Sequence, residues 1–208
     1  MLLKVEKRWV IAFIITAIVA MVSLFWPTKL PDASSGVFLE ENNLVGADIA
    51  WLLASSGLVL LMTPGLSFFY GGMVGKKNVI STMLQSFIAL GVISLVWVIV
   101  GFSLSFGDSL GFYIGKEHYG IIGNPFSFTF FNQVGVLPHS KMASTVPFIL
   151  FALFQMKFAV ITPAIITGSF AERVRFVSYL LFIVLFSLFI YAPLAHMVWS
   201  GDGFLVKF

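Results

Sequence analysis

Hydrophobic residues gather in five long segments that polar residues rarely interrupt. Each segment falls within or above the range of about 17–25 residues that a helix uses to cross the hydrocarbon core of a bilayer. This pattern predicts an all-α membrane protein, with end points known to within a few residues. The segments run over residues 9–26, 50–70, 80–106, 145–170 and 174–195.

Most charged residues lie in the connections between these segments, and the sign of the charge alternates. Lys76 and Lys77 follow the second segment and Arg173 and Arg175 follow the fourth, whereas the connection before the second segment is mainly acidic. Cytoplasmic loops carry an excess of Lys and Arg. We therefore expect a multi-pass protein of the cell (inner) membrane with these two short connections in the cytoplasm.

The first segment has two interpretations. Lys4, Lys7 and Arg8 precede it and the small residues of DASSG (32–36) follow, as in a cleaved signal peptide. Its apolar run is nevertheless longer than the 7–15 residues usual for a signal core. We therefore divide the chain into residues 1–44, a leader or extra helix with an external linker, and residues 45–208, the main domain.

Composition supports a membrane protein and excludes several other classes. The chain is 59% hydrophobic and 10% charged, against about 25% charged residues in soluble domains. It has no cysteine, no glycine-rich phosphate loop and no basic cluster of the kind that binds nucleic acid. His118, His139 and His196 lie at or beyond segment ends without metal-like spacing. We expect no enzymatic activity, metal, cofactor or nucleic-acid partner.

A few residues inside the segments have more than one interpretation. Pro64 and Pro163 interrupt the second and fourth segments, either as simple kinks or beside a lined pathway. Gly71 and Gly75 have the spacing that lets two helices approach closely. Lys157 is costly within a membrane segment. It either snorkels, pairs with another helix, or tunes an entrance by its charge.

Four stretches in order resemble the first four helices of the ammonium transporter (Amt/Rhesus) family, from about residue 45 to 201. The resemblance implies the N-terminal four helices of an eleven-helix inverted-repeat fold, assembled as a homotrimer, that transports ammonium or ammonia across the lipid bilayer. The stretches are ADIAWLLASSGLVLLMTPGLSFFYGGMVGKKNV, VWVIVGFSLSFG, FQMKFAVITPAIITGSFAERVRF and YAPLAHMVW.

The family motifs also imply the site. Phe158 and Trp199, with Phe154, match the external vestibule that recruits ammonium by cation–π contact, and Phe158 matches one ring of the gate below it. Leu66, Phe69, Tyr70 and Ile165 match the apolar pore lining. From hydropathy alone, Trp199 has a second interpretation, as an aromatic anchor at the membrane interface.

The chain departs from the family pattern in two local places. Met156 and Lys157 stand where small residues are usual, and Ser200-Gly201-Asp202-Gly203 replaces a run of glycines. A lysine directed inward would repel ammonium, so we expect Lys157 to point outward, toward lipid or a neighbouring subunit. His196 is expected in the loop at the vestibule.

The chain also departs from the family in length, because it stops after the fourth family helix. The two pore histidines and the second gate phenylalanine of the family have no counterpart in it, so we expect these 208 residues alone not to conduct ammonia. Three interpretations stay open. The chain is the N-terminal portion of an ammonium channel, or an ammonium-sensing module with a signalling partner on the cytoplasmic side, or a non-conducting degenerate fragment.

Overall fold

The structure is a computed structural model that describes residues 7–26 and 28–207. Lys4 and the side chains of Lys7 and Arg8, used above for orientation, lie outside what it describes. The main helices are α1 (Lys7–Phe25), α2 (Gly46–Met73), α3 (Val79–Val96), α4 (Phe102–Phe106), α5 (Phe148–Phe170), α6 (Phe176–Phe186) and α7 (Ala192–Trp199). Short helical turns are η1 (Ala33–Ser35), η2 (Glu41–Asn43) and η4 (Thr129–Phe131).

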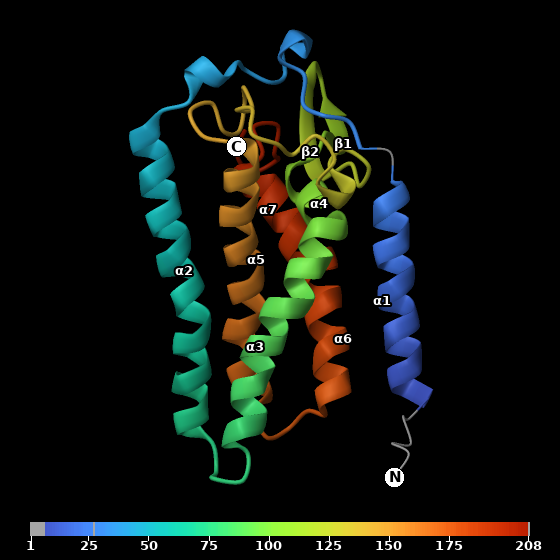
Figure 1. Cartoon of the computed structure of the whole chain (residues 1–208), viewed down its shortest axis with the longest axis vertical. Helices are drawn as coiled ribbons and strands as arrows, with labels where there is room; N and C mark the ends of the chain where they lie inside the picture. Colours follow the sequence, from blue (N-terminus) through green and yellow to red (C-terminus); the bar gives the residue numbers. More distant parts are fainter. Residues whose placement is uncertain (1–6, 27, 208) are drawn as a thin grey trace.

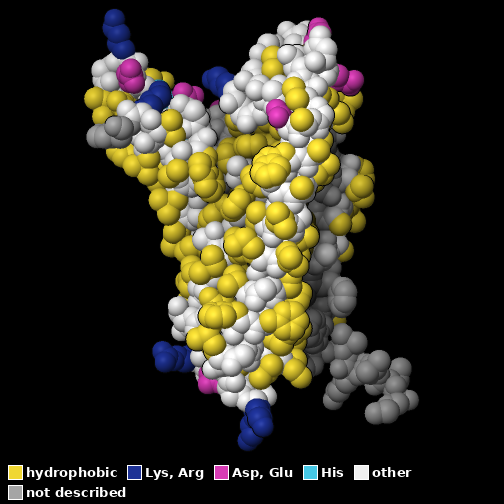
Figure 2. Space-filling model, turned by 90° about the vertical axis from the view of Figure 1, so that its left-hand side faces the viewer, with side chains coloured by type: hydrophobic (Ala, Val, Ile, Leu, Met, Phe, Trp, Pro, Cys, Tyr) yellow, Lys and Arg dark blue, Asp and Glu magenta, His cyan; other side chains and the backbone are white. Residues whose placement is uncertain are grey.

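Four continuous helices are long and apolar enough to cross a membrane, and they coincide with the last four predicted segments. They cover Gly46–Met73, Val79–Phe106, Phe148–Phe170 and Phe176–Trp199. On the face shown in Figure 2, charged side chains gather at the two ends and the middle is hydrophobic. The prediction of a multi-pass helical membrane protein is confirmed.

The helices stand side by side with their long axes roughly aligned (Figure 1). α2, α3 and α5 pack against one another, and α6 packs against α3 and α5. α1 stands on the opposite side of the bundle from α2 (Figure 1). Its outer end is attached by the ring of Trp26, 5.4 Å from that of Phe130. The predicted first segment therefore forms a helix, and its role as a leader stays a prediction.

Aromatic side chains fill the core between the outer halves of the helices. Trp97, Phe102, Phe106 and Phe148 are almost fully buried. The Phe102 ring centroid lies 5.4 Å from those of both Phe106 and Phe148. Trp97 also donates a hydrogen bond from Nε1 to the carbonyl of Ala152 on α5, at 3.1 Å. This bond gives an acceptor to the N–H of the buried indole. Without one, burial of that polar group would lower the stability of the fold.

Two of the long helices contain a π-helical turn, η3 (Trp97–Gly101) between α3 and α4, and η5 (Ser187–Tyr191) between α6 and α7. The two turns meet, since the ring centroids of Trp97 and Tyr191 lie 6.3 Å apart. Such turns insert one residue into a helix and often occur near functional sites. They also shift the faces that α4 and α7 present relative to α3 and α6.

A two-stranded antiparallel hairpin, β1 (Ser109–Ile114) and β2 (Glu117–Gly123), covers the end of the bundle opposite Lys76. Sequence analysis predicted only a connection here, so the all-α description needs this addition. The register shifts between Leu110 and Gly111. A Cβ at Gly111 would lie 1.8 Å from the carbonyl oxygen of Tyr119. Glycine is therefore required where the two strands come this close.

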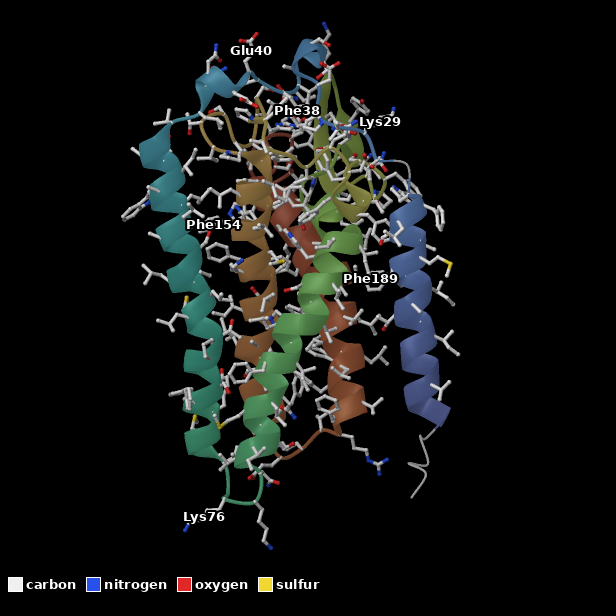
Figure 3. The ribbon with its side chains drawn as sticks, viewed as in Figure 1. Lys29, Phe38, Glu40, Lys76, Phe154 and Phe189 are labelled. Atoms are coloured by element: carbon white, nitrogen blue, oxygen red, sulfur yellow. The ribbon has the colours of Figure 1, made fainter. Side chains whose placement is uncertain are left out.

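The last part of the predicted external linker packs as part of the same cap. Phe38, seen near the top of Figure 3, is 4% exposed and its ring lies 5.4 Å from that of His139. The amide of Leu39 donates to the carbonyl of Pro138 at 2.8 Å. The predicted domain boundary after residue 44 stays a prediction, but residues 37–45 are structurally joined to the cap.

Burial of His139 in this cap predicts that folding stability depends on pH. Burial, and then the positive charge of Lys141, lower the pKa of His139 below its ordinary value of 6.5, and Asp108 opposes the shift. Below about pH 6.5 the unfolded chain therefore binds more protons than the folded one, and folding stability falls. Above that pH the effect disappears.

We expect the thermal midpoint in detergent to drop between about pH 7.5 and pH 5.5, because His139 binds a proton more readily in the unfolded chain. His139→Asn keeps an acceptor for the amide of Lys141, which bonds Nδ1 at 3.3 Å in the native chain. This variant should show a smaller drop. An equal drop in both proteins would contradict the assignment to His139.

Candidate functional site

Three aromatic rings from two distant parts of the sequence meet where the first half of α5 passes the end of α7. Phe154 and Phe158 lie one helical turn apart on the same face of α5, with ring centroids 5.1 Å apart. The ring centroid of Trp199, at the end of α7, lies 6.3 Å from that of Phe158. Trp199 is 49% exposed, and the two phenylalanines are half-buried. We call this group the ring site.

The ring site can hold a small cation in chemical terms. Each aromatic face carries a negative quadrupole that attracts a cation within about 6 Å of the ring centre. Figure 3 shows Phe154 between α2 and α5, well above the end that carries Lys76. The site thus lies toward the capped end of the bundle, as the sequence predicted for Phe154, Phe158 and Trp199. Their roles in ammonium binding stay predictions.

His196, one turn before Trp199, fixes the end of α7. It is fully buried. Nδ1 lies 3.0 Å from the carbonyl oxygen of Ser105, and Nε2 lies 2.8 Å from the hydroxyl oxygen of Ser109. A neutral ring with its hydrogen on Nδ1 satisfies both bonds, since Nε2 then accepts from the hydroxyl. The expectation that His196 lies in a loop is wrong, because the helix continues through it to Trp199.

The segment after Trp199 is held against the hairpin by close backbone contacts. Gly120 donates to the carbonyl of Asp202 and accepts from the amide of Phe204, both at 2.8 Å. A Cβ at Gly203 would lie 2.4 Å from the carbonyl oxygen of Met197. The segment Ser200-Gly201-Asp202-Gly203 lacks the full glycine run of the family, but it keeps a glycine at position 203, where α7 leaves no room for a side chain.

At the other end of the bundle, Tyr70 joins α2 to α5. Its hydroxyl donates to the carbonyl of Ile165 at 2.6 Å. Both residues line a cavity of about 330 Å³ near the inner ends of these helices. Of the other residues predicted to line a pore, Leu66 is half-buried, and Phe69 is 60% exposed with its ring 5.3 Å from that of Tyr70. These four roles stay predictions.

Glu172 links the two basic connections, a role that the sequence alone did not indicate. Its Oε1 accepts from the amide of Gly75 at 2.8 Å and from Nδ2 of Asn78 at 2.9 Å. The bond from Asn78, then that from Gly75, lowers the pKa of Glu172.

The two glycines of the predicted close-approach spacing have different neighbours. Gly71 packs against α3, where a Cβ would lie 2.8 Å from Cγ of Met83. Gly75 instead faces Glu172.

Lys157 does not point outward as expected. Its Nζ donates to the carbonyl of Leu153 at 3.2 Å. It lines a small cavity between α5, α2 and α3, together with Leu60, Thr63, Leu90, Ser94, Met156 and Val160. The expectation failed because α2 and α3 cover this face of α5, which the uniformly apolar sequence of α5 does not reveal. α2 and α5 both continue through their prolines.

Gly168 gives a prediction about the junction of α2 and α5. A methyl group there would lie 2.4 Å from Cε1 of Tyr70, so Gly168→Ala should push the ring away and break its bond to Ile165. We expect a loss of about 1–3 kcal/mol, typical of overpacking. Tyr70→Phe, which removes only the hydroxyl, should cost about 0.5–1.5 kcal/mol.

The measurement for this prediction is thermal or denaturant unfolding of the purified protein in detergent. Gly72→Ala is the matched control, since a Cβ at Gly72 would meet nothing within 4 Å. That variant should keep its stability or gain slightly from the higher helix propensity of alanine. Equal losses in the Gly168 and Gly72 variants would show that the Tyr70 contact is not responsible.

Comparison with known proteins agrees with this geometry. A model described as the Ammonium Transporter Family matches residues 50–208. The ammonium transporter of Aquifex aeolicus (strain VF5) is 39% identical over 175 residues, which cover 84% of this chain and 38% of the relative. That of Bacillus subtilis (strain 168) is 45% identical over 154 residues, covering 74% of this chain and 35% of the relative.

Solved structures give the same result at the level of the fold. The crystal structure of Saccharomyces cerevisiae Mep2 superposes with a TM-score of 0.67 and 32% identity over 79% of this chain and 34% of that one. A structure titled Sensor Amt Protein gives a TM-score of 0.62 and 29% identity over 76% of this chain and 36% of that one. The chain spans about a third of the length of the curated relatives it matches.

The order of the four spans, the ring site and the match over residues 50–208 agree with one another. The chain belongs to the ammonium transporter family.

Proposed function

We propose that this chain contributes to a transmembrane pathway for ammonium or ammonia, with Phe154, Phe158 and Trp199 as the external cation site. The observation that carries the proposal is the approach of the Phe158 ring of α5 and the Trp199 ring at the end of α7 to 6.3 Å. It is supported by curated relatives that are named ammonium transporters.

The chemistry of ammonium explains why rings suit this position. An ammonium ion entering the bundle loses part of its hydration, and aromatic faces replace some of it, at about 0.5–2 kcal/mol per contact. Beyond the ring site the surroundings are apolar, where an unpaired charge is very costly. Transfer of a proton from ammonium to external water near Phe158, which acts as a gate, avoids that cost. Neutral ammonia then passes Leu66, Phe69, Tyr70 and Ile165.

The proposed orientation follows from the charges at the two ends. Lys76 lies at the lower end of Figure 3 and Glu40 at the upper end. Lys77, Arg173 and Arg175 lie in the same two connections as Lys76 and Glu172. By the positive-inside rule this end faces the cytoplasm, so in this proposal the ring site opens toward the external side of the cell (inner) membrane. Assembly as a homotrimer belongs to this proposal.

Sensing is a second candidate, favoured by the similarity to the structure titled Sensor Amt Protein. In that case the ring site binds ammonium without transport, and a signalling partner reads the occupied state at the cytoplasmic end. Uptake of radiolabelled methylammonium by cells that produce the intact natural polypeptide separates the two. Uptake supports transport, whereas saturable ammonium binding without uptake supports sensing.

The ring site gives a direct prediction. In the intact natural protein, Trp199→Leu should weaken methylammonium affinity by about 2- to 30-fold, the factor that corresponds to a lost cation–π contact. Trp51→Leu is the matched control, because Trp51 also lies near an outer helix end but is 76% exposed. Affinity is measured from the concentration dependence of uptake or binding.

The same experiment tests the alternative that Trp199 only anchors the protein at the membrane interface. The amount of assembled protein in the membrane is measured for both variants. A loss of assembled protein without a change in affinity would favour the anchor and contradict the cation site.

A further inference from the structure

Lys157 carries a charge at an unusual place, near the middle of a membrane-spanning helix. In the four described spans, the side chains that carry a full charge at neutral pH are Asp48, in the first turn of α2, and Lys157, near the middle of α5. A lysine at the centre of a membrane helix costs about 2.5–3.5 kcal/mol on insertion scales. A residue placed at such a cost, and not used by the mechanism above, requires a separate explanation.

The described surroundings of Lys157 offer polar neighbours but no acidic partner. Nζ donates to the carbonyl of Leu153 at 3.2 Å. The cavity that it lines has a volume of about 40 Å³ and includes Thr63 of α2 and Ser94 of α3. That is enough room for a water molecule, which needs about 10–15 Å³ and two or more polar neighbours. No carboxylate lines this cavity among the described residues, and neither described ion pair includes Lys157.

The charge lies close to the ring site, on another face of the same helix. Because Nζ bonds the carbonyl of Leu153, it lies about one turn above its own Cα, at the depth of Phe154. The ring of Phe158 faces Trp199, the ring of Phe154 packs on that of Phe158 between α2 and α5, and Lys157 lines the cavity toward α2 and α3. Residues three positions apart on a helix are neighbours, with Cβ atoms about 5–6 Å apart, so the charge lies beside Phe154 and within roughly 10 Å of a cation at the ring site.

We propose that Lys157 is a specificity-determining residue, a fixed positive charge that opposes cations at the ring site and below it. This inference rests on the proposed function of the ring site. Two unit charges about 10 Å apart in an effective dielectric of about 20 repel enough to weaken binding about tenfold. Neutral ammonia has no net charge and passes without this penalty. The lysine thus keeps cation binding weak and disfavours the passage of metal cations.

The test compares charge-removing and charge-keeping substitutions in the intact natural protein. Lys157→Met removes the charge and keeps an unbranched apolar side chain, and Lys157→Arg keeps the charge. Met156→Leu changes the lining of the same cavity without changing the charge. The probe is radiolabelled methylammonium, with Cs⁺ and K⁺ as competitors.

We expect the Lys157→Met protein to reach half-saturation at about tenfold lower methylammonium. Inhibition by Cs⁺ and K⁺ should shift to lower concentration by a similar factor. Lys157→Arg and Met156→Leu should behave like the native protein. If Lys157→Met does not accumulate in the membrane, Lys157→Gln removes the charge, retains a donor for the carbonyl of Leu153, and carries the same expectation.

Three results would overturn the inference. In the first, the neutral substitutions do not increase affinity for the cations. In the second, Lys157→Arg matches Lys157→Met. In the third, Met156→Leu produces the same shift by repacking the cavity alone. A native protein that neither binds nor takes up methylammonium overturns the proposed function and this inference together. A native protein that takes it up, with affinity unchanged by Lys157→Met, overturns only the role of Lys157.

Discussion

The exclusion of unpaired polar groups from hydrocarbon is the constraint on which this structure depends. With no water available inside a bilayer, backbone amides and carbonyls must bond within their own helix. The four described spans are helical, and α2 and α5 continue as helices through Pro64 and Pro163, each of which lacks the amide that would bond the carbonyl four residues earlier. Side chains then supply the few bonds that join one helix to another. Trp97 bonds the carbonyl of Ala152, and Tyr70 bonds that of Ile165.

The same constraint makes the external cap part of the site. Irregular backbone is possible there because it lies beyond the apolar middle of the bundle. His196 connects the two regions, since one ring nitrogen bonds the end of α4 and the other bonds the start of β1. Trp199, three residues later, therefore has a fixed position relative to Phe158. A cation–π site requires this, because ring position decides the strength of the contact.

Features that depend on local composition were predictable from the sequence, and features that depend on distant partners were not. The four spans follow from runs of apolar residues. The hairpin was missed because its short strands lie in a connection of mixed charge, and its pairing rests on glycine contacts such as that of Gly111 with Tyr119. Family motifs brought Phe158 and Trp199 together correctly. The burial of His196 and the inward direction of Lys157 depend on neighbours from other helices, which no local pattern identifies.

The rotation of α5 about its own axis determines the character of the whole site. Phe158 faces Trp199 while Lys157, one residue earlier, faces α2 and α3. Successive residues of a helix are about 100° apart around its axis. A rotation of α5 by that angle would therefore turn the charged Lys157 side chain, in place of the Phe158 ring, toward Trp199. The bonds from Trp97 and Tyr70 to carbonyls near each end of α5 oppose such a rotation. The attraction of a cation by the rings and its repulsion by Lys157 thus both depend on the bonds that hold α5 in this orientation.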